Sequence, residues 1–100
     1  MFRVILRIDV KPGSAQEFEA VWRKMAGTVS LRPENLDQWL LRGTEDDTAY
    51  FVVTDWTDEA SFREFEHSAE HLGHRAALAP FRRGGWMETT QVAEHVTGTR

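Results

Sequence analysis

The sequence predicts an α+β fold of the ferredoxin-like type, a four-stranded antiparallel sheet with its helices on one face. Two observations predict it. Four stretches alternate apolar and polar residues or are rich in β-branched ones, as strands are, and two others space their apolar residues three and four positions apart, as helices do. Their order is β-α-β-β-α-β, and the right-handed crossover rule then leaves one obvious topology.

The first half of this pattern is a strand followed by a helix. Every second residue from Phe2 to Val10 is apolar, which indicates a strand over residues 2–10, and Lys11-Pro12-Gly13 is typical of a turn. Ser14 is the expected N-cap of the first helix, with Glu17 completing a capping box. The helix should bury one apolar stripe, made of Phe18, Val21, Trp22, Met25 and Val29.

The remaining elements follow after the break at Pro33. Strands are expected over residues 36–42 and 49–56, joined by a polar hairpin loop over 43–47. Thr57 or Asp58 can cap the second helix, which runs towards Pro80 and could break at Ser68 or Gly73. After a loop, the β-branched residues of 86–96 indicate the fourth strand.

Length, composition and charge exclude several classes of protein. One hundred residues suit a single domain, with a core over about 2–96 and a short tail over 97–100. The sequence contains no run long and apolar enough to span a membrane, and we expect no signal peptide, because residues 1–10 lack its apolar core and cleavage site. The absence of cysteine excludes thiolate chemistry, and the net charge of −4 argues against a nucleic-acid partner. We expect a cytoplasmic protein.

Both faces of the predicted sheet carry apolar side chains, although the helices cover only one. In the third strand Phe51 and Val53 point one way, and Tyr50, Val52 and Trp56 point the other. A sheet with one solvated face should alternate more cleanly. We therefore expect a homodimer in which two copies pack sheet to sheet, the alternative being a scatter of exposed apolar groups on a monomer.

The segment LLRGTEDDTAYFVVTDWTDEASFREFEHSAEH, above all its W-x-D-E-x-x-F part, resembles the antibiotic biosynthesis monooxygenase (ABM) family of dimeric α+β-barrel proteins. The resemblance spans residues 2–96. It implies a dimer whose subunits each hold an apolar pocket between sheet and helices. Many members of this family are oxygenases that need no metal or flavin and convert aromatic phenols or anthrones to quinones with molecular oxygen.

The sequence departs from two patterns within that family. Anthrone-oxidising members carry an asparagine and a tyrosine where this chain has Val52 and Phe62, whereas Trp56 matches. Haem-degrading relatives need an asparagine in the first strand, a tryptophan where this chain has Phe65, and a histidine one residue away from His74. We therefore expect neither haem nor any other cofactor, with oxygen as co-substrate.

The second helical segment carries three histidines, His67, His71 and His74. On one straight helix they lie opposite the apolar stripe and face water, which is the ordinary interpretation. A break at Ser68 would instead start a new helix with His71, Arg75 and Leu78 on one stripe, able to face a pocket. Because three imidazoles on one helix rarely converge on an ion, no metal site is expected.

The residues expected to act in such an oxygenase form two groups. His71 or His74 would accept a proton, Trp56 would stack on the substrate or donate its N–H, and Arg75 would stabilise the anion. Substrate-binding residues would be Trp39, Tyr50, Phe62, Phe65, Trp86 and Arg7. Structural alternatives are a core position for Trp56, an interface position for Tyr50 and pairing of Arg7 with Asp9.

The sequence therefore predicts a cofactor-independent oxygenase acting on an aromatic polyketide-type phenol or anthrone in antibiotic biosynthesis. Two alternatives stay open on the same scaffold. A polyketide cyclase or aromatase needs the same base and pocket without oxygen, and an accessory protein could bind the ligand without catalysis. Motifs of other enzyme classes, such as G-x-G-x-x-G, the P-loop and H-E-x-x-H, do not occur.

Overall fold

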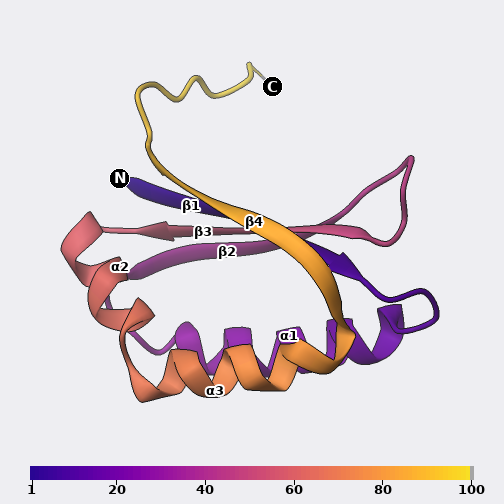
Figure 1. The fold of residues 1–100 in the computed structure, drawn as a ribbon. Helices are drawn as coiled ribbons and strands as arrows, with labels where there is room; N and C mark the ends of the chain where they lie inside the picture. Colours follow the sequence, from indigo (N-terminus) through magenta and orange to yellow (C-terminus); the bar gives the residue numbers. More distant parts are fainter. Residues whose placement is uncertain (100) are drawn as a thin grey trace.

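The computed structural model describes residues 1–99 and has one four-stranded antiparallel sheet with its α-helices on one face (Figure 1). The strands lie in the order β2 (Asn35–Arg42), β3 (Ala49–Trp56), β1 (Phe2–Val10) and β4 (Arg82–Gln91). This is the predicted ferredoxin-like fold. Of the predicted tail, Arg100 lies outside the described residues.

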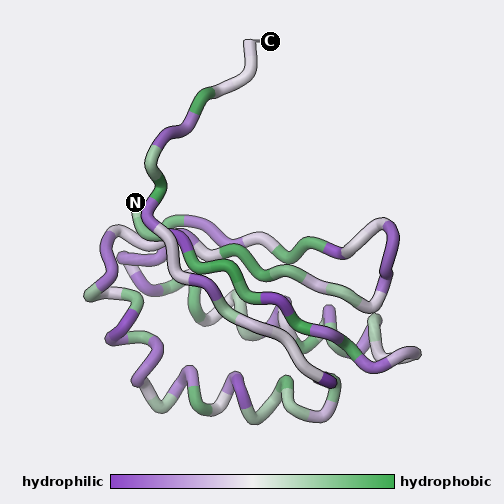
Figure 2. The backbone as a smooth tube through the Cα atoms, turned by 45° about the horizontal axis from the view of Figure 1, so that its top comes forward, coloured by the Kyte–Doolittle hydropathy of each residue, from purple (hydrophilic) through white to green (hydrophobic). Residues whose placement is uncertain are grey.

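β1 is central and sets the two faces of the sheet. It pairs with β3 on one side, with Phe2 opposite Trp56, and with β4 on the other, with Phe2 opposite Gln91. Hydrophobic and hydrophilic residues alternate along it (Figure 2). Since successive side chains point to opposite faces, the buried residues of β1 all face the helices: Phe2, Val4, Ile8 and Val10.

α1 (Ala15–Val29) lies across the sheet and buries Phe18 and Val29 from the predicted stripe. The turn before it needs Gly13, whose φ is +82°, a conformation that residues with a Cβ rarely adopt. The predicted capping box was wrong, because the side chain of Ser14 makes no capping hydrogen bond. Ser14 instead accepts the first helical bond, from the N–H of Phe18, with its backbone carbonyl.

The second helical segment is broken at Ser68, one of the two positions that the sequence indicates. α2 (Glu59–Glu66) begins at Asp58, whose carboxylate accepts the backbone N–H of Ser61 at 2.8 Å. α3 (Ala69–Leu78) begins at Ser68, whose hydroxyl accepts the N–H of His71. No break occurs at Gly73, which lies inside α3.

β4 begins four residues earlier and ends five residues earlier than the predicted strand over 86–96. A short 3₁₀ turn (Ala79–Phe81) leads from α3 straight into it, so the predicted loop is itself part of the strand. The strand ends at Gln91 because β1 begins at Phe2 and leaves nothing further to pair with. Residues 92–99 extend away from the body of the fold (Figure 1).

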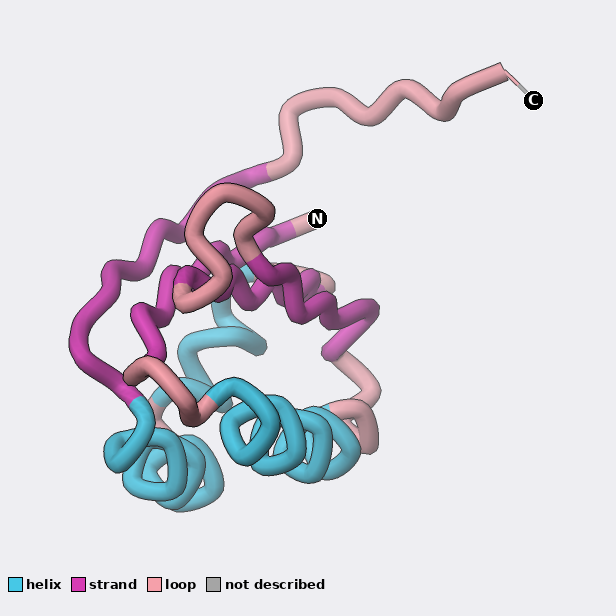
Figure 3. The backbone as a smooth tube through the Cα atoms, turned by 90° about the vertical axis from the view of Figure 1, so that its right-hand side faces the viewer, coloured by secondary structure: helices cyan, strands magenta, loops and turns pink. Residues whose placement is uncertain are grey.

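The two layers leave one sheet face uncovered (Figure 3). This open face carries the side chains of Arg3, Arg7, Trp39, Val53 and Trp86, which alternate with the helix-facing residues. On the covered face, α3 has no fully buried residue, in contrast to α1 and α2. α3 therefore covers the sheet without packing tightly into it.

Within residues 1–99, none of the helices combines the length and apolar character that crossing a membrane requires.

Candidate functional site

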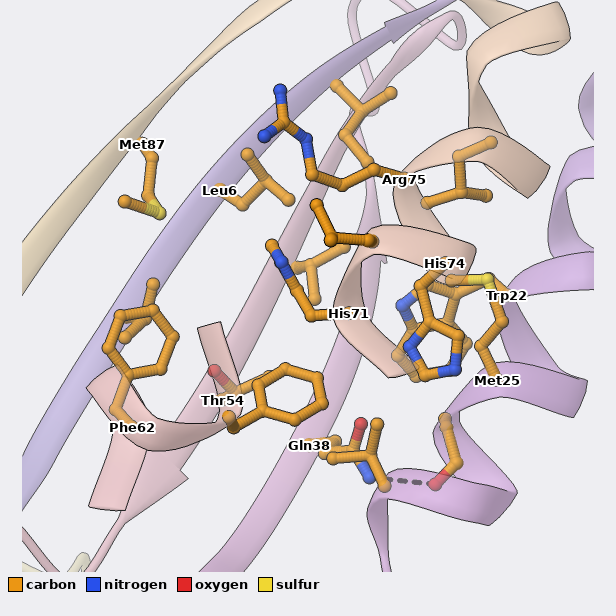
Figure 4. A pocket seen from close by; sticks show the side chains of 18 of the residues that line it. Leu6, Trp22, Met25, Gln38, Thr54, Phe62, His71, His74, Arg75 and Met87 are labelled. Carbon is orange, nitrogen blue, oxygen red and sulfur yellow. Dashed lines mark hydrogen bonds between the residues drawn. The ribbon is translucent and has the colours of Figure 1, made fainter. Parts of the chain in front are cut away.

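A cavity of about 440 Å³ lies between the sheet and the helices (Figure 4). All four strands and α1, α2 and α3 contribute to its wall. Most of the lining side chains are apolar, and the volume lies within the range typical of small-molecule sites. The lining residues that bear polar or charged groups are Trp22, Gln38, Thr54, Trp56, His71, His74, Arg75 and Arg82.

One wall of the cavity is aromatic. The ring of Trp56 stacks on Phe65, with centroids 5.2 Å apart, and meets the ring of Phe62 edge-on at 5.8 Å. Phe65 in turn contacts His71 edge-on at 5.1 Å. The end of β3 and the inner face of α2 therefore bring together three of the predicted site residues, Trp56, Phe62 and Phe65, beside the imidazole.

Trp56 occupies the core position that was the structural alternative for it. Its side chain is buried, and its indole N–H donates to the hydroxyl of Thr54 at 3.0 Å. A ligand oxygen could use this donor only by displacing Thr54. The role that the geometry leaves to Trp56 is to hold Phe65, and through it the wall next to His71.

His71 points into the cavity because the chain breaks at Ser68. The new helix has its N-cap at Ser68, three residues before His71. The side on which His71 would lie in one straight helix therefore no longer applies. The Nδ1 atom is buried and has no hydrogen-bond partner of good geometry among the described residues. Burial lowers the pKa of His71, the charge of Arg75 lowers it further, and Glu66 partly opposes both. The neutral imidazole, which can accept a proton, is thus the favoured form.

His74 and Arg75 line the cavity from the same helix. The Nε2 atom of His74 lies 3.5 Å from the hydroxyl of Thr28, so this imidazole links α3 to α1 at the cavity edge. Arg75 follows His71 by one helical turn, and within residues 1–99 no carboxylate lies within 4 Å of its guanidinium. The imidazole of His71 and the positive charge of Arg75 are therefore neighbours (Figure 4).

His67 lies apart from the other two histidines. It follows the last turn of α2, its side chain is exposed, and Glu66 is 3.9 Å away. The part of the chain that the structure describes has no group of three or more histidine, aspartate or glutamate side chains arranged to hold a metal ion.

Four of the predicted substrate-binding residues lie away from the cavity. Trp39, Trp86 and Arg7 are on the open face, where both indoles are well exposed, at 40% and 50%. Alternation places them there, since Trp39 lies opposite Val53, and Trp86 opposite Arg7. Arg7 pairs with Asp9 at 2.9 Å, the structural alternative that the sequence offered.

Tyr50 lies neither in the cavity nor on the open face, where an interface position would put it. It is fully buried against Phe18, and its hydroxyl donates to the carboxylate of Glu19 on α1. Burial and this bond raise the pKa of Tyr50, so the phenol stays neutral. Its position makes it part of the core at the other end of the sheet from Trp56.

Several lining residues were not singled out from the sequence. Gln38 projects from β2 and donates its side-chain N–H to the carbonyl of Ala26 at 3.0 Å. Met87 of β4 lies opposite Leu6, and both reach the cavity. Gln38 could have been found, because it lies two residues before Leu40 in the strand and therefore points to the same, helix-facing side. Met87 and Arg82 could not, because they depend on the register of β4.

Comparison with known proteins agrees with this architecture. The model of the family described as antibiotic biosynthesis monooxygenase matches residues 1–77. Protein SchA of Streptomyces halstedii is 27% identical over 82 residues, which are 82% of this chain and 22% of SchA. The 42.8 kDa protein in the whiE locus of Streptomyces coelicolor is 30% identical over 77% of this chain and 19% of its own length. The chain therefore spans about a fifth of the length of these curated relatives.

Solved structures show the same fold. SnoaB of Streptomyces nogalater, described as a cofactor-independent oxygenase, superimposes with a TM-score of 0.86 at 24% identity, over 97% of both chains. A conserved protein of Methanosarcina mazei Go1 superimposes with a TM-score of 0.83 at 18% identity, over 90% of both chains. The match of the family model over three quarters of the sequence shows that this chain belongs to the antibiotic biosynthesis monooxygenase family.

Proposed function

We propose that this protein is a cofactor-independent oxygenase that oxidises an aromatic polyketide-type phenol or anthrone to a quinone with molecular oxygen. The observation that carries the proposal is His71, a histidine biased towards its neutral form that faces an apolar, aromatic-walled cavity beside Arg75. The description of SnoaB as a cofactor-independent oxygenase supports the same chemistry on this fold.

The first step needs a base and an anion-stabilising group. His71 takes a proton from the activated methylene of the anthrone, and the electron pair of that C–H bond spreads over the ring onto the carbonyl oxygen. Arg75, which is exposed at the edge of the cavity, stabilises this oxyanion, an interaction that gains strength when the bound substrate displaces water from the cavity. The protonated imidazole that results is itself disfavoured by burial and by Arg75, so it returns the proton readily.

Oxygen then enters as the oxidant. The anion transfers one electron to O₂, the two radicals combine to form a C–O bond, and a proton gives the hydroperoxide. Loss of the second C–H proton and cleavage of the O–O bond release water and leave the quinone carbonyl. One anthrone and one O₂ thus become one quinone and one water, and the substrate supplies all the electrons.

We also propose that two copies of the chain associate through the open face. Trp39 lies under the guanidinium of Arg3, 5.3 Å from the ring centroid, and Trp86 contacts Phe51 at 6.4 Å. With Leu41 and Val53 these residues form an exposed apolar surface across the sheet. A second copy would remove that surface from water and leave both cavities open on the other side.

The decisive experiment measures oxygen uptake with anthrone at pH 7, corrected for spontaneous oxidation. We expect one O₂ consumed per anthraquinone formed, and a fall in kcat of about 100-fold or more in His71→Gln. His67→Gln is the matched control, because it removes an exposed imidazole four residues away, and it should keep full activity.

Other outcomes would redirect the proposal. Unchanged oxygen uptake in His71→Gln would show that another group is the base. Ring closure of a polyketide substrate without oxygen uptake would support a cyclase instead. Ligand binding without turnover of any phenol or anthrone would support an accessory protein.

A further inference from the structure

Arg82 lines the cavity but has no part in the chemistry proposed above. The side chain is half-buried, and its Nε donates to the backbone carbonyl of Gly84 at 3.2 Å. Among residues 1–99 no carboxylate lies within 4 Å of this guanidinium. The other half-buried arginines all have carboxylate partners, in the pairs Arg3–Asp55, Arg7–Asp9, Arg32–Glu70 and Arg63–Glu66.

A β-bulge selects Arg82 rather than Arg83 for the cavity. From Phe2 to Asp9 the two strands pair in a constant register, with Asp9 opposite Gly84. Continuing that register would place Arg83 opposite Val10, but the register shifts there and Arg82 takes the position. Val10 is buried on the helix-facing side, so its partner faces the cavity, while Arg83 is exposed and bonds to Thr48. Bulges commonly re-aim side chains in this way beside functional sites.

The charged side chains of the cavity wall are all positive among the described residues. Its charged lining residues are Arg75 and Arg82, and within the part of the chain that the structure describes no aspartate or glutamate lines it. Arg82 is half-buried and Arg75 is exposed, so an anion in the cavity would add charge-assisted hydrogen bonds to guanidinium groups that have no carboxylate partner among residues 1–99. In a chain of net charge −4, this wall selects for an anionic ligand.

The position of Arg82 indicates which part of a ligand it meets. The β1 residues in the cavity wall run from Val4 to Ile8, a distance of roughly 13 Å along a strand. Trp56 lies opposite Phe2 at one end of this line, and Arg82 lies opposite Val10 at the other. A ligand with its ring against the aromatic wall and His71 would therefore present its far end to Arg82.

We propose that Arg82 binds a carboxylate at the far end of an aromatic substrate, so that the cavity takes aromatic acids in preference to their neutral analogues. The planar guanidinium can still offer donors beyond the Nε–H that Gly84 occupies, and an arginine fork matches a carboxylate. The inference rests on the proposed function only in using the same cavity for the ring.

The test compares binding of anthraquinone-2-carboxylate and its neutral amide, anthraquinone-2-carboxamide, by titration calorimetry at pH 7. We expect the wild type to bind the carboxylate about tenfold more tightly or better. In Arg82→Gln this ratio should fall to about one, with the affinity for the amide unchanged, because only the charge-assisted bonds are lost. Arg83→Gln, which makes the same change one residue away, should keep the wild-type ratio.

Three results would overturn the inference: equal affinity of the wild type for both probes, no binding of either, or the same ratio in Arg82→Gln as in the wild type. Circular dichroism and thermal unfolding of each variant verify that the fold is intact, and Arg82→Lys tests whether charge without the fork suffices. Because anthrone itself carries no acid, its oxidation tests the proposed function separately. Oxygen uptake with anthrone together with no carboxylate preference would refute the role of Arg82 alone.

Discussion

The hydroxyl oxygen of Ser68 accepts a hydrogen bond from the backbone N–H of His71 at 3.2 Å. The same hydroxyl donates to the carbonyl of Phe65 at 2.6 Å. One side chain therefore satisfies a backbone group at the end of α2 and another at the start of α3. This junction turns His71 from the solvated side of a continuous helix towards the cavity.

Removing that hydroxyl should weaken the junction. We expect Ser68→Ala to lower the free energy of unfolding by about 1 kcal/mol, the usual effect of losing an N-cap side chain. Urea unfolding followed by circular dichroism measures it. Ser14→Ala is the control, because Ser14 is the N-cap of α1 but its side chain makes no capping hydrogen bond. Equal stability of Ser68→Ala and the wild type would contradict this account.

The pH dependence of His71 follows from the direction of its pKa. Burial, and then Arg75, lower that pKa below its ordinary value of 6.5, so the neutral base persists at more acidic pH than an ordinary histidine allows. The acidic limb of kcat/KM against pH should therefore lie below 6.5. NMR titration of labelled histidine assigns the group. An imidazole of His71 that titrates above pH 6.5 would exclude this explanation.

The same shift makes the stability of the fold depend on pH. A histidine whose folded pKa is depressed stabilises the native state fully above the unfolded pKa, and that contribution is lost as the pH falls through 6.5 towards the folded pKa. We expect the difference in unfolding free energy between wild type and His71→Gln to decrease over this window. A difference that stays constant from pH 8 to 5 would argue against a buried neutral His71.

Asp55 is a fully buried carboxylate on β3 that pairs with Arg3 through two bonds, of 2.7 and 2.9 Å. We expect Asp55→Asn to lower the unfolding free energy by about 1 to 2 kcal/mol, because the substitution removes a charge-assisted hydrogen bond. The expected loss is at the low end for such bonds because Arg3 is partly exposed to solvent. Asp9→Asn, which breaks the more exposed pair with Arg7, should cost less than 1 kcal/mol, as surface pairs do. Denaturant midpoints compare the two, and equal losses would show that burial of Asp55 is unimportant.

The open face should decide the oligomeric state. Light scattering of the wild type should give twice the chain mass of 11.5 kDa, and Val53→Glu, which places a charge among Trp39 and Leu41, should give a monomer. Leu31→Glu adds the same charge at a site already 81% exposed and should leave the dimer intact. A wild type of 11.5 kDa would refute the interface.

Most of the fold could be predicted because the strands have local sequence signals, such as the alternation of β1 and the β-branched and aromatic residues of β3. The bounds of β3 match the prediction, and β2 differs by one residue. β4 could not be placed as well, because its bounds depend on what β1 offers as a partner. The β-branched residues up to Val96 favour a strand locally, but no strand lies beside those after Gln91.

The residues of the candidate site, too, could be predicted from the sequence only in part. His71 and Arg75 could be predicted once a break at Ser68 was considered, since that break changes the phase of the helix. Trp39 and Trp86 were assigned by residue type, yet alternation within their strands sends both to the open face. Arg82 depends on a bulge, and a one-residue shift in pairing leaves no mark in the local hydrophobic pattern.

The absence of any fully buried residue in α3 has a consequence for access to the cavity. Segments with few buried apolar contacts open with small free energies, well below that of global unfolding. The backbone amides of α3 should therefore exchange with deuterium faster than those of α1. An occupied cavity would give α3 new contacts and slow that exchange, so the rate itself would report whether the helix is the entrance.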